Sequence, residues 1–381
     1  MLKRLLYIAG ILGLLIGLWG LYDRLVYGHM HANYGSYVVW GLWVALYMFF
    51  AGVATGSFML ATLDLLFDLP LFRGSGRMAL WGALVTLPAG LAAIGLDLGH
   101  MSRIWKVYLQ PHFGSVMAQL VWGYTIFLGI IIISLWLSFQ PQRSRWLKPI
   151  MAVGLILAIF LSGGIGALLG VNQNRVSWHV SNLPAQFPVF NLTSGVALML
   201  IAIGWFGPQH DSRRTRQLHV LSLAMVVLLL VKGYYLWSDV SQALYQNSSH
   251  GAAAINLVLF GPYGWAFWLL QLGIGMLLPL IILTMPIGKQ GFSAGLMGLC
   301  ILIGLAVARA NIIFPALSLP ELQGLGEAFH GPHLSFTYSP SLMEWAVTAG
   351  IVGAATIGFL VGTDRLPLFT RPTTEATVTA D

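Results

Sequence analysis

Ten apolar stretches, each long enough to cross a lipid bilayer, fill the chain between residues 5 and 363. A spanning helix needs roughly 20 mostly apolar residues, because in hydrocarbon every backbone polar group must be hydrogen-bonded within the protein. Charged residues make up only 8% of the sequence, whereas about 25% is usual in a soluble globular domain. The pattern predicts an all-α integral membrane protein.

The apolar stretches predict ten transmembrane helices near residues 5–22, 38–66, 78–98, 116–137, 149–169, 184–205, 218–237, 263–284, 292–313 and 343–363. The first stretch follows Lys3 and Arg4, as in a signal peptide, but no small-residue cleavage site follows it, so we interpret it as a helix. We expect two four-helix bundles, 38–169 and 181–313, plus one flanking helix at each end. Residues 364–381 are predicted to form a disordered cytoplasmic tail.

Basic residues in the loops indicate the orientation. Four lie on one side, namely Arg24, Arg103, Lys106 and Arg175. Thirteen lie on the side of the termini, namely Lys3, Arg4, Arg73, Arg77, Arg143, Arg145, Lys148, Arg213, Arg214, Arg216, Lys289, Arg365 and Arg371. Because cytoplasmic loops carry the excess of Lys and Arg, both termini are expected inside a bacterial or archaeal cytoplasmic (inner) membrane. These loops explain the net charge of +7, and nothing in them predicts nucleic-acid binding.

Most titratable residues fall on the opposite, outer side. Eight of the ten histidines lie in or beside outer loops, namely His29, His31, His100, His112, His179, His250, His330 and His333. Four carboxylates lie at the same depth, namely Asp97, Glu321, Glu327 and Glu344. Histidines also favour interfaces for structural reasons, so two interpretations remain open. The functional one is proton exchange near neutral pH at the outer face.

Redox centres are not expected within this sequence. No histidine lies in the middle of a span, where haem ligands would face each other, and Cys300 is the only cysteine. Haem ligation and iron–sulfur clusters need more ligands than this. If the protein handles electrons, a partner must carry them.

Four segments resemble the NrfD/PsrC family, the quinone-reactive membrane subunits of polysulfide reductase and its relatives. They are WGLWVALYMFFAGVATG at 40–56, LDLGHMSR at 96–103, PHFGSVM at 111–117 and VNQNRVSW at 171–178. The resemblance covers roughly residues 38–200, and the extra helix at each end is similar to the ten-helix branch of that family.

This resemblance implies a membrane subunit of a respiratory oxidoreductase complex that oxidises quinol or reduces quinone, such as menaquinone, at the outer face. It implies an iron–sulfur partner subunit of ferredoxin type. Behind that subunit it implies a molybdopterin enzyme, hydrogenase or multihaem catalytic subunit. Besides these proteins, membrane lipid is the expected partner. Tyr47 stands where the polysulfide reductase subunit has a quinone-contacting His, so only the location of the site carries over.

Quinone chemistry needs an apolar slot and a proton donor or acceptor at each carbonyl oxygen. Asp97 and His100, three residues apart, are the predicted catalytic pair. The predicted quinone-binding residues are Trp43, Tyr47, Arg103, His112, Gln119, Arg175 and Trp178. Structural alternatives remain: Asp97 could pair with Arg103 or Arg175, and the aromatic residues could belong to the interfacial belt.

Charges within the membrane suggest a second role. Asp64, Lys232 and Arg309 are predicted as a proton path between the two faces. Alternatively they are structural, and Lys232 simply extends its amine towards the interface.

Two other functions stay open, a secondary transporter and a passive membrane anchor, although no convincing internal repeat supports a transporter. The long outer loops 238–262 and 310–342 are predicted to dock an extracytoplasmic partner. Co-purification of an iron–sulfur complex discriminates the first hypothesis from a transporter that works on its own.

Overall fold

The computed structural model describes residues 1–142, 144–175, 177–178, 182–208, 212–245, 249–322, 324–329 and 331–369. Within them, ten helices are long and apolar enough to cross a membrane, and no strand occurs. The predicted all-α membrane fold with ten spans is therefore confirmed.

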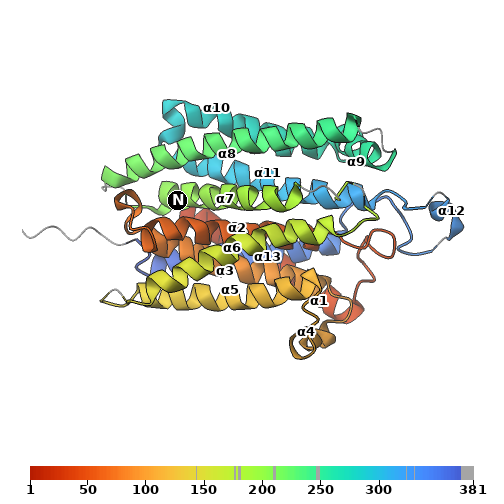
Figure 1. Cartoon of the computed structure of the whole chain (residues 1–381), viewed down its shortest axis with the longest axis horizontal. Helices are drawn as coiled ribbons and strands as arrows, with labels where there is room; N and C mark the ends of the chain where they lie inside the picture. Colours follow the sequence, from red (N-terminus) through yellow and green to blue (C-terminus); the bar gives the residue numbers. More distant parts are fainter. Residues whose placement is uncertain are drawn as a thin grey trace, which may run out of the picture.

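The spanning helices are α1 (Leu2–Tyr27), α2 (Leu42–Leu65), α3 (Gly76–Asp97), α5 (Val116–Ser138), α6 (Leu147–Gly170), α7 (Leu183–Ile201) with η3 (Ala202–Phe206), α8 (Ser212–Tyr245), η4 (Ala266–Leu277) with α10 (Leu278–Thr284), α11 (Gly291–Leu317) and α13 (Leu342–Arg365). The short helices are η1 (Pro70–Phe72), η2 (Met101–Arg103), α4 (Trp105–Leu109), α9 (Ser249–Leu259), η5 (Pro286–Lys289) and α12 (Leu325–Ala328). We call the side where α1 begins the N-terminal side and the other the distal side. Figure 1 shows α4, α9 and α12 together at the distal side.

Three predicted non-helical segments contain helix, and one of them is the outer loop 310–342, which holds the end of α11 and the whole of α12. Residues 238–262 were expected to form a long loop, but α8 continues to Tyr245 and α9 follows from Ser249. The predicted tail at 364–381 begins within the last turn of α13, and residues 370–381 lie outside the described part of the chain. Hydropathy marks the apolar length of a helix, whereas the helix itself ends where its backbone hydrogen bonds end.

The first and last helices pack against each other through small residues. A Cβ added at Gly17 of α1 would lie 2.2 Å from the Cα of Gly350 in α13, so the two backbones touch. Glycines at such crossings let membrane helices approach closely. The two flanking helices therefore form one pair, which the sequence did not predict.

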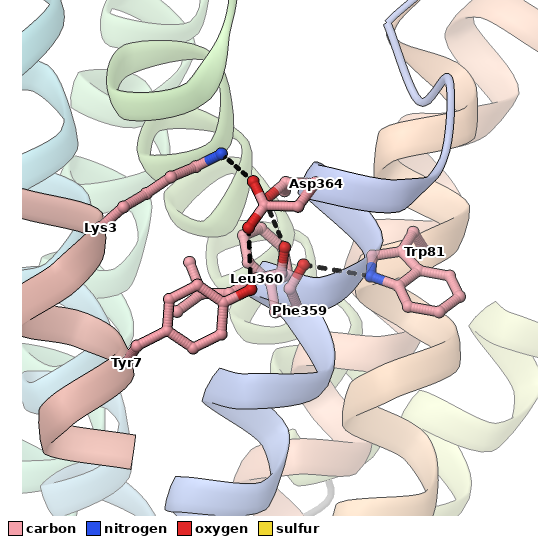
Figure 2. Close-up of polar contacts among 7 residues, drawn as sticks. Lys3, Tyr7, Trp81, Phe359, Leu360 and Asp364 are labelled. Atoms are coloured by element: carbon pink, nitrogen blue, oxygen red, sulfur yellow. Dashed lines mark hydrogen bonds and ion pairs between the residues drawn. The ribbon is translucent and has the colours of Figure 1, made fainter. Parts of the chain in front are cut away.

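Polar contacts close this pair at the N-terminal side. Figure 2 shows Lys3 and Tyr7 of α1 reaching Asp364 of α13, with a distance of 2.8 Å from the Tyr7 hydroxyl to Asp364 Oδ2. Trp81 of α3 donates its indole N–H to the Phe359 carbonyl oxygen at 3.3 Å. The start of α1 and the end of α13 consequently lie on the same side, as an even number of spans requires.

The core of the molecule is α2, the most buried of the spans. It crosses α7 at Gly56, where an added Cβ would lie 1.8 Å from the main-chain oxygen of Asn191. At Gly52 an added Cβ would lie 2.5 Å from Asn191 Oδ1. Both glycines therefore serve close packing between α2 and α7.

Candidate functional site

Ionisable side chains gather at the distal side, where α1 and α3 end and where α2 and α13 begin. Asp97 is the last residue of α3, His29 and Tyr34 come from the segment between α1 and α2, and Trp43 lies in the first turn of α2. We call these four residues the distal cluster. Asp97 Oδ1, His29 Nε2 and the Tyr34 hydroxyl are buried without a hydrogen-bond partner among the described residues. Since buried polar groups are normally paired, this arrangement is typical of a binding site.

The aromatic rings of the distal cluster stand close together. The ring centroids of His29 and Tyr34 are 5.4 Å apart, and that of Trp43 is 6.1 Å from Tyr34 and 6.4 Å from His29. The Tyr34 hydroxyl lies close to the Asp97 carboxylate, and the His29 ring lies close to the Asp97 backbone, but neither contact has the geometry of a full hydrogen bond. The cluster thus combines a base, a carboxylate, a phenol and an indole.

The last spanning helix holds the cluster from one side. Trp43 Nε1 donates to the main-chain oxygen of Glu344 at 3.1 Å. The buried Glu344 carboxylate accepts the N–H groups of Asn33 (3.1 Å) and Ser341 (2.9 Å) and the hydroxyl of Tyr338. Ser341 and Glu344 also form the capping box of α13. The segment that carries His29 and Tyr34 is therefore tied to α13.

Arg24 fixes the end of α3 from the α1 side. Its buried guanidinium donates to the carbonyl oxygens of Leu96 (2.7 Å) and Leu98 (2.8 Å), the residues that flank Asp97. The last carbonyl groups of a helix have no partner within the helix, so Arg24 supplies one. It also brings a positive charge beside the Asp97 carboxylate.

Burial sets the protonation states in the loop between α1 and α2. Desolvation, and after it the charge of Arg24, lowers the pKa of His29 below its usual range. Desolvation, and after it the Asp97 carboxylate, raises the pKa of the Tyr34 phenol. At neutral pH His29 is therefore a neutral base and Tyr34 keeps its proton, which gives an acceptor and a donor side by side.

The predicted first-bundle residues separate into two groups. Trp43 and Asp97 belong to the distal cluster, and Tyr47 lies one turn deeper on α2, where its ring meets that of Tyr124 at 6.0 Å. The others lie in the stretch from α3 to the start of α5. His100, Arg103 and His112 are exposed there, and Gln119 Nε2 donates to the Phe113 carbonyl oxygen at 2.7 Å.

Arg175 and Trp178 connect the end of α6 to α11. Arg175 donates to the carbonyl oxygens of Ala316 (2.9 Å) and Leu319 (2.7 Å) and pairs with Glu321 at 3.0 Å. Burial lowers its pKa. The Trp178 indole stacks on Trp40 at 5.6 Å and donates to the Ile312 carbonyl oxygen at 2.7 Å. Both residues hold the loop after α6 against α11 and the residues that follow it.

The three predicted proton-path residues lie at different depths. Asp64 is at the N-terminal side, where its Oδ2 accepts the N–H groups of Gly74 (2.9 Å) and Gly76 (2.8 Å) at the start of α3. Lys232 and Arg309 are buried in the distal half, 3% and 2% exposed. Lys232 therefore does not extend towards the interface.

Two members of the distal cluster were not among the predicted site residues. His29 was counted only as one of the outer histidines, and Tyr34 gave no signal. Both lie in the irregular segment 28–41, which has no periodicity from which to predict side-chain direction. The only sequence signal for a buried partner of Asp97 was that two histidines, His29 and His31, follow the first span. His31 is instead exposed and pairs with Asp23 at 2.9 Å.

Comparison with known sequences matches residues 31–321 to the family described as "Polysulphide reductase, NrfD". The chain belongs to the NrfD family. Its helix count and the position of the matched region, which begins just before α2 and ends just after α11, agree with the resemblance found in the sequence motifs.

Three relatives match most of the chain. A selenate reductase subunit of Mesobacillus selenatarsenatis is 29% identical, over 97% of this chain and 96% of the relative. The Hdr-like menaquinol oxidoreductase integral membrane subunit of Archaeoglobus fulgidus is 24% identical, over 90% of this chain and 88% of the relative. One of the polysulfide reductase chains of Wolinella succinogenes is 24% identical, over 73% of this chain and 94% of the relative.

Proposed function

We propose that this protein is the quinone-reactive membrane subunit of a respiratory oxidoreductase complex, and that it oxidises quinol or reduces quinone at the outer face of the cytoplasmic membrane. The observation that carries the proposal is the distal cluster, with its three buried polar atoms that lack partners among the described residues. The name of one relative, a menaquinol oxidoreductase subunit, supports the substrate class.

The residues of the distal cluster suit quinol oxidation as well as quinone reduction. Oxidation of a quinol to a quinone releases two electrons and two protons. Neutral His29 accepts one proton at Nε2 and the Asp97 carboxylate accepts the other, while the Tyr34 hydroxyl donates a hydrogen bond to a substrate oxygen. The Trp43 ring forms an apolar wall. Quinone reduction reverses each proton transfer. His29 here takes the role expected of His100, whose side chain is exposed.

A single cysteine cannot hold an iron–sulfur cluster, so this chain cannot carry one itself. The two electrons therefore pass to or from an iron–sulfur partner subunit. That partner connects to a catalytic subunit of molybdopterin, hydrogenase or multihaem type. The positive-inside bias of the loops supports assigning the distal side to the outer face. Both termini are then cytoplasmic.

For the iron–sulfur subunit we propose the segment between α3 and α5 as the docking surface, in place of the loops 238–262 and 310–342 that were predicted from sequence. The segment starts beside Asp97, so a bound partner would lie next to the quinone. Its large apolar side chains are exposed, namely Ile104, Trp105, Tyr108, Leu109 and Phe113. Exposed apolar groups of this density on a protein surface commonly mark an interaction site. Figure 1 shows α4 projecting from the bundle at this place.

The proposal is tested by quinone-linked turnover in the assembled complex. Asp97→Asn and His29→Ala should each lower turnover about 10²-fold, the scale of a lost proton-transfer group, with assembly intact. His219→Ala, a change at an exposed histidine on the N-terminal side, is the matched control. His100→Ala should resemble that control. Wild-type turnover in an assembled Asp97→Asn/His29→Ala double variant would refute the proposal.

Docking is tested separately. Leu109→Glu places a charge in the proposed surface, where the side chain is 74% exposed, and should reduce co-purification of the iron–sulfur subunit. Ile287→Glu, an exposed change on the N-terminal side, should leave the complex intact. Equal recovery of the partner from both variants would exclude this surface.

A further inference from the structure

A cavity with polar groups lies apart from the distal cluster, between α7, α8, α9, η4 and α11. Its volume is about 240 Å³, and most of its wall is apolar, including the rings of Trp178, Phe190 and Phe267. None of the four residues of the distal cluster lines it. It is therefore a separate space within the membrane region.

Lys232 supplies an unpaired donor to this cavity. Its side chain lines the wall and is 3% exposed, and its Nζ has no hydrogen-bond partner among the described residues. Arg309 lies nearby; its NH2 donates to Asn191 Oδ1 at 2.7 Å, while NH1 likewise has no partner there. Ionisable groups at membrane depth are costly and normally have a named partner. A ligand that accepts a hydrogen bond would provide it.

A carboxylate lies on the same wall. Asp239 lines the cavity and accepts the amide N–H of Gln186 at 2.9 and 3.0 Å. Lys232 and Asp239 are seven residues apart on α8, which places them on one face of the helix, about 10 Å apart along its axis. The cavity thus has a donor at one end, Lys232, and a second donor at the other, the Gln186 amide, which Asp239 orients.

This polarity selects the class of ligand. A purely anionic ligand would be repelled by Asp239, and a cationic one by Lys232 and Arg309. A flat, neutral ring with oxygens on opposite edges fits the apolar walls and can bond at both ends. We infer that this cavity binds a second quinone headgroup, with one oxygen accepting a hydrogen bond from Lys232 and the other accepting one from the Gln186 amide, which Asp239 holds in place.

The inference rests on the proposed function, since it takes its ligand from that chemistry, but it concerns binding alone and assigns no redox step to the cavity. Its consequence is a stoichiometry of two quinones per copy of the protein. The two sites depend on different residues, Asp97 for one and Lys232 for the other, so they can be removed independently.

The test is photolabelling of the purified complex with an azido-naphthoquinone, followed by peptide mapping and by titration of bound label. Wild-type protein should take up two equivalents, in peptides near Asp97 and in peptides of α8, α9 and α11. Lys232→Met should weaken labelling of the second set alone, about tenfold or more, the effect of a lost hydrogen bond to a charged group. Lys148→Met, at a half-exposed lysine outside the cavity, is the control.

The outcomes separate the two hypotheses. One equivalent that is lost in Asp97→Asn and unaffected by Lys232→Met would overturn this inference and leave the proposed function standing. No binding at all would remove both. If Lys232→Met does not assemble, Ile255→Trp, which fills the cavity from α9, must abolish the second set of labelled peptides. Retained labelling in that variant also overturns the inference.

Discussion

The indole N–H of Trp43 donates a 3.1 Å hydrogen bond to the main-chain oxygen of Glu344, 301 residues further along the sequence. This contact joins the start of α2 to the start of α13. The wall of the distal cluster therefore depends on the last spanning helix, although α13 contributes no group to the cluster itself. Glu344 is the centre of that dependence, because its carboxylate also bonds the segment that carries His29 and Tyr34.

Replacing Glu344 by alanine should destabilise the protein. The change leaves three donors without their acceptor, at Asn33, Ser341 and Tyr338. Of these, only the hydrogen bond from the Tyr338 hydroxyl is fully buried, and a buried donor left unpaired costs about 1–3 kcal/mol, so a loss of about that size is expected. Thermal unfolding of the detergent-solubilised complex measures it. Glu327→Ala, at an exposed glutamate in α12, serves as control, and equal unfolding temperatures would contradict the prediction.

Turnover should fall at acidic pH because His29 becomes protonated. Burial and Arg24 lower the pKa of His29, whereas a free histidine titrates near 6.5. Quinol oxidation, which uses the neutral base, should hold at about pH 6.5 and decline only below it. A pH profile of turnover measures this acidic decline, which His29→Ala should remove and His219→Ala should keep. An unchanged decline in His29→Ala would assign it to another group.

The same shift affects stability. The folded protein binds a proton at His29 less readily than the unfolded chain does, so acidification through the unfolded pKa favours unfolding. The contribution of His29 is present above about pH 6.5 and is lost as pH falls through the lowered folded pKa. Unfolding temperature should thus decrease less steeply with acid in His29→Ala than in wild type.

The spans could be predicted from sequence because ten apolar stretches leave the backbone no alternative to helices in a bilayer. The pairing of α1 with α13 could not. Stripes of small residues occur in most of these helices, so the contact between Gly17 and Gly350 has no distinctive signal. Helix ends were also missed where polar residues continue a helix, as Asp239 does in α8 by bonding Gln186.

The residues of the site could be predicted only where they lie on a regular helix. Asp97 and Trp43 end and begin helices, so their depth and side follow from the span boundaries. His29 and Tyr34 occupy an irregular loop whose path depends on hydrogen bonds to α13, such as that from Asn33 to Glu344. The stretch after Asp97 is equally irregular, and for that reason spacing alone could not tell whether His100 turns inward.

Gly56→Ala should block folding or assembly. A Cβ at this position would lie 1.8 Å from the Asn191 oxygen and 2.9 Å from the Gly195 nitrogen, and both are backbone atoms that cannot turn aside. Overpacking a tight interface typically costs about 1–3 kcal/mol and occasionally more. The yield of assembled complex in membranes measures the effect. Gly129→Ala is the control, since nothing lies within 4 Å of its added Cβ, and equal yields would refute this account of the α2–α7 crossing.

Asp64 should act as a helix cap and not as a proton carrier. Its Oδ2 bonds the N–H groups of Gly74 and Gly76 at the start of α3, which accounts for a buried carboxylate without any proton transfer. Asp64→Ala should therefore lower stability by about 1 kcal/mol.

Energy coupling is the corresponding functional test. With quinone and electron partner on the same side, turnover moves no net charge unless protons cross the bundle, and each charge moved is worth about 2.3 kcal/mol per 100 mV. We predict that the complex in liposomes, monitored with a potential-sensitive dye, builds no uncoupler-sensitive potential during quinone turnover. Asp64→Asn and Lys232→Met should give the same trace as wild type. A potential that either variant abolishes would show that these charges carry protons across the membrane.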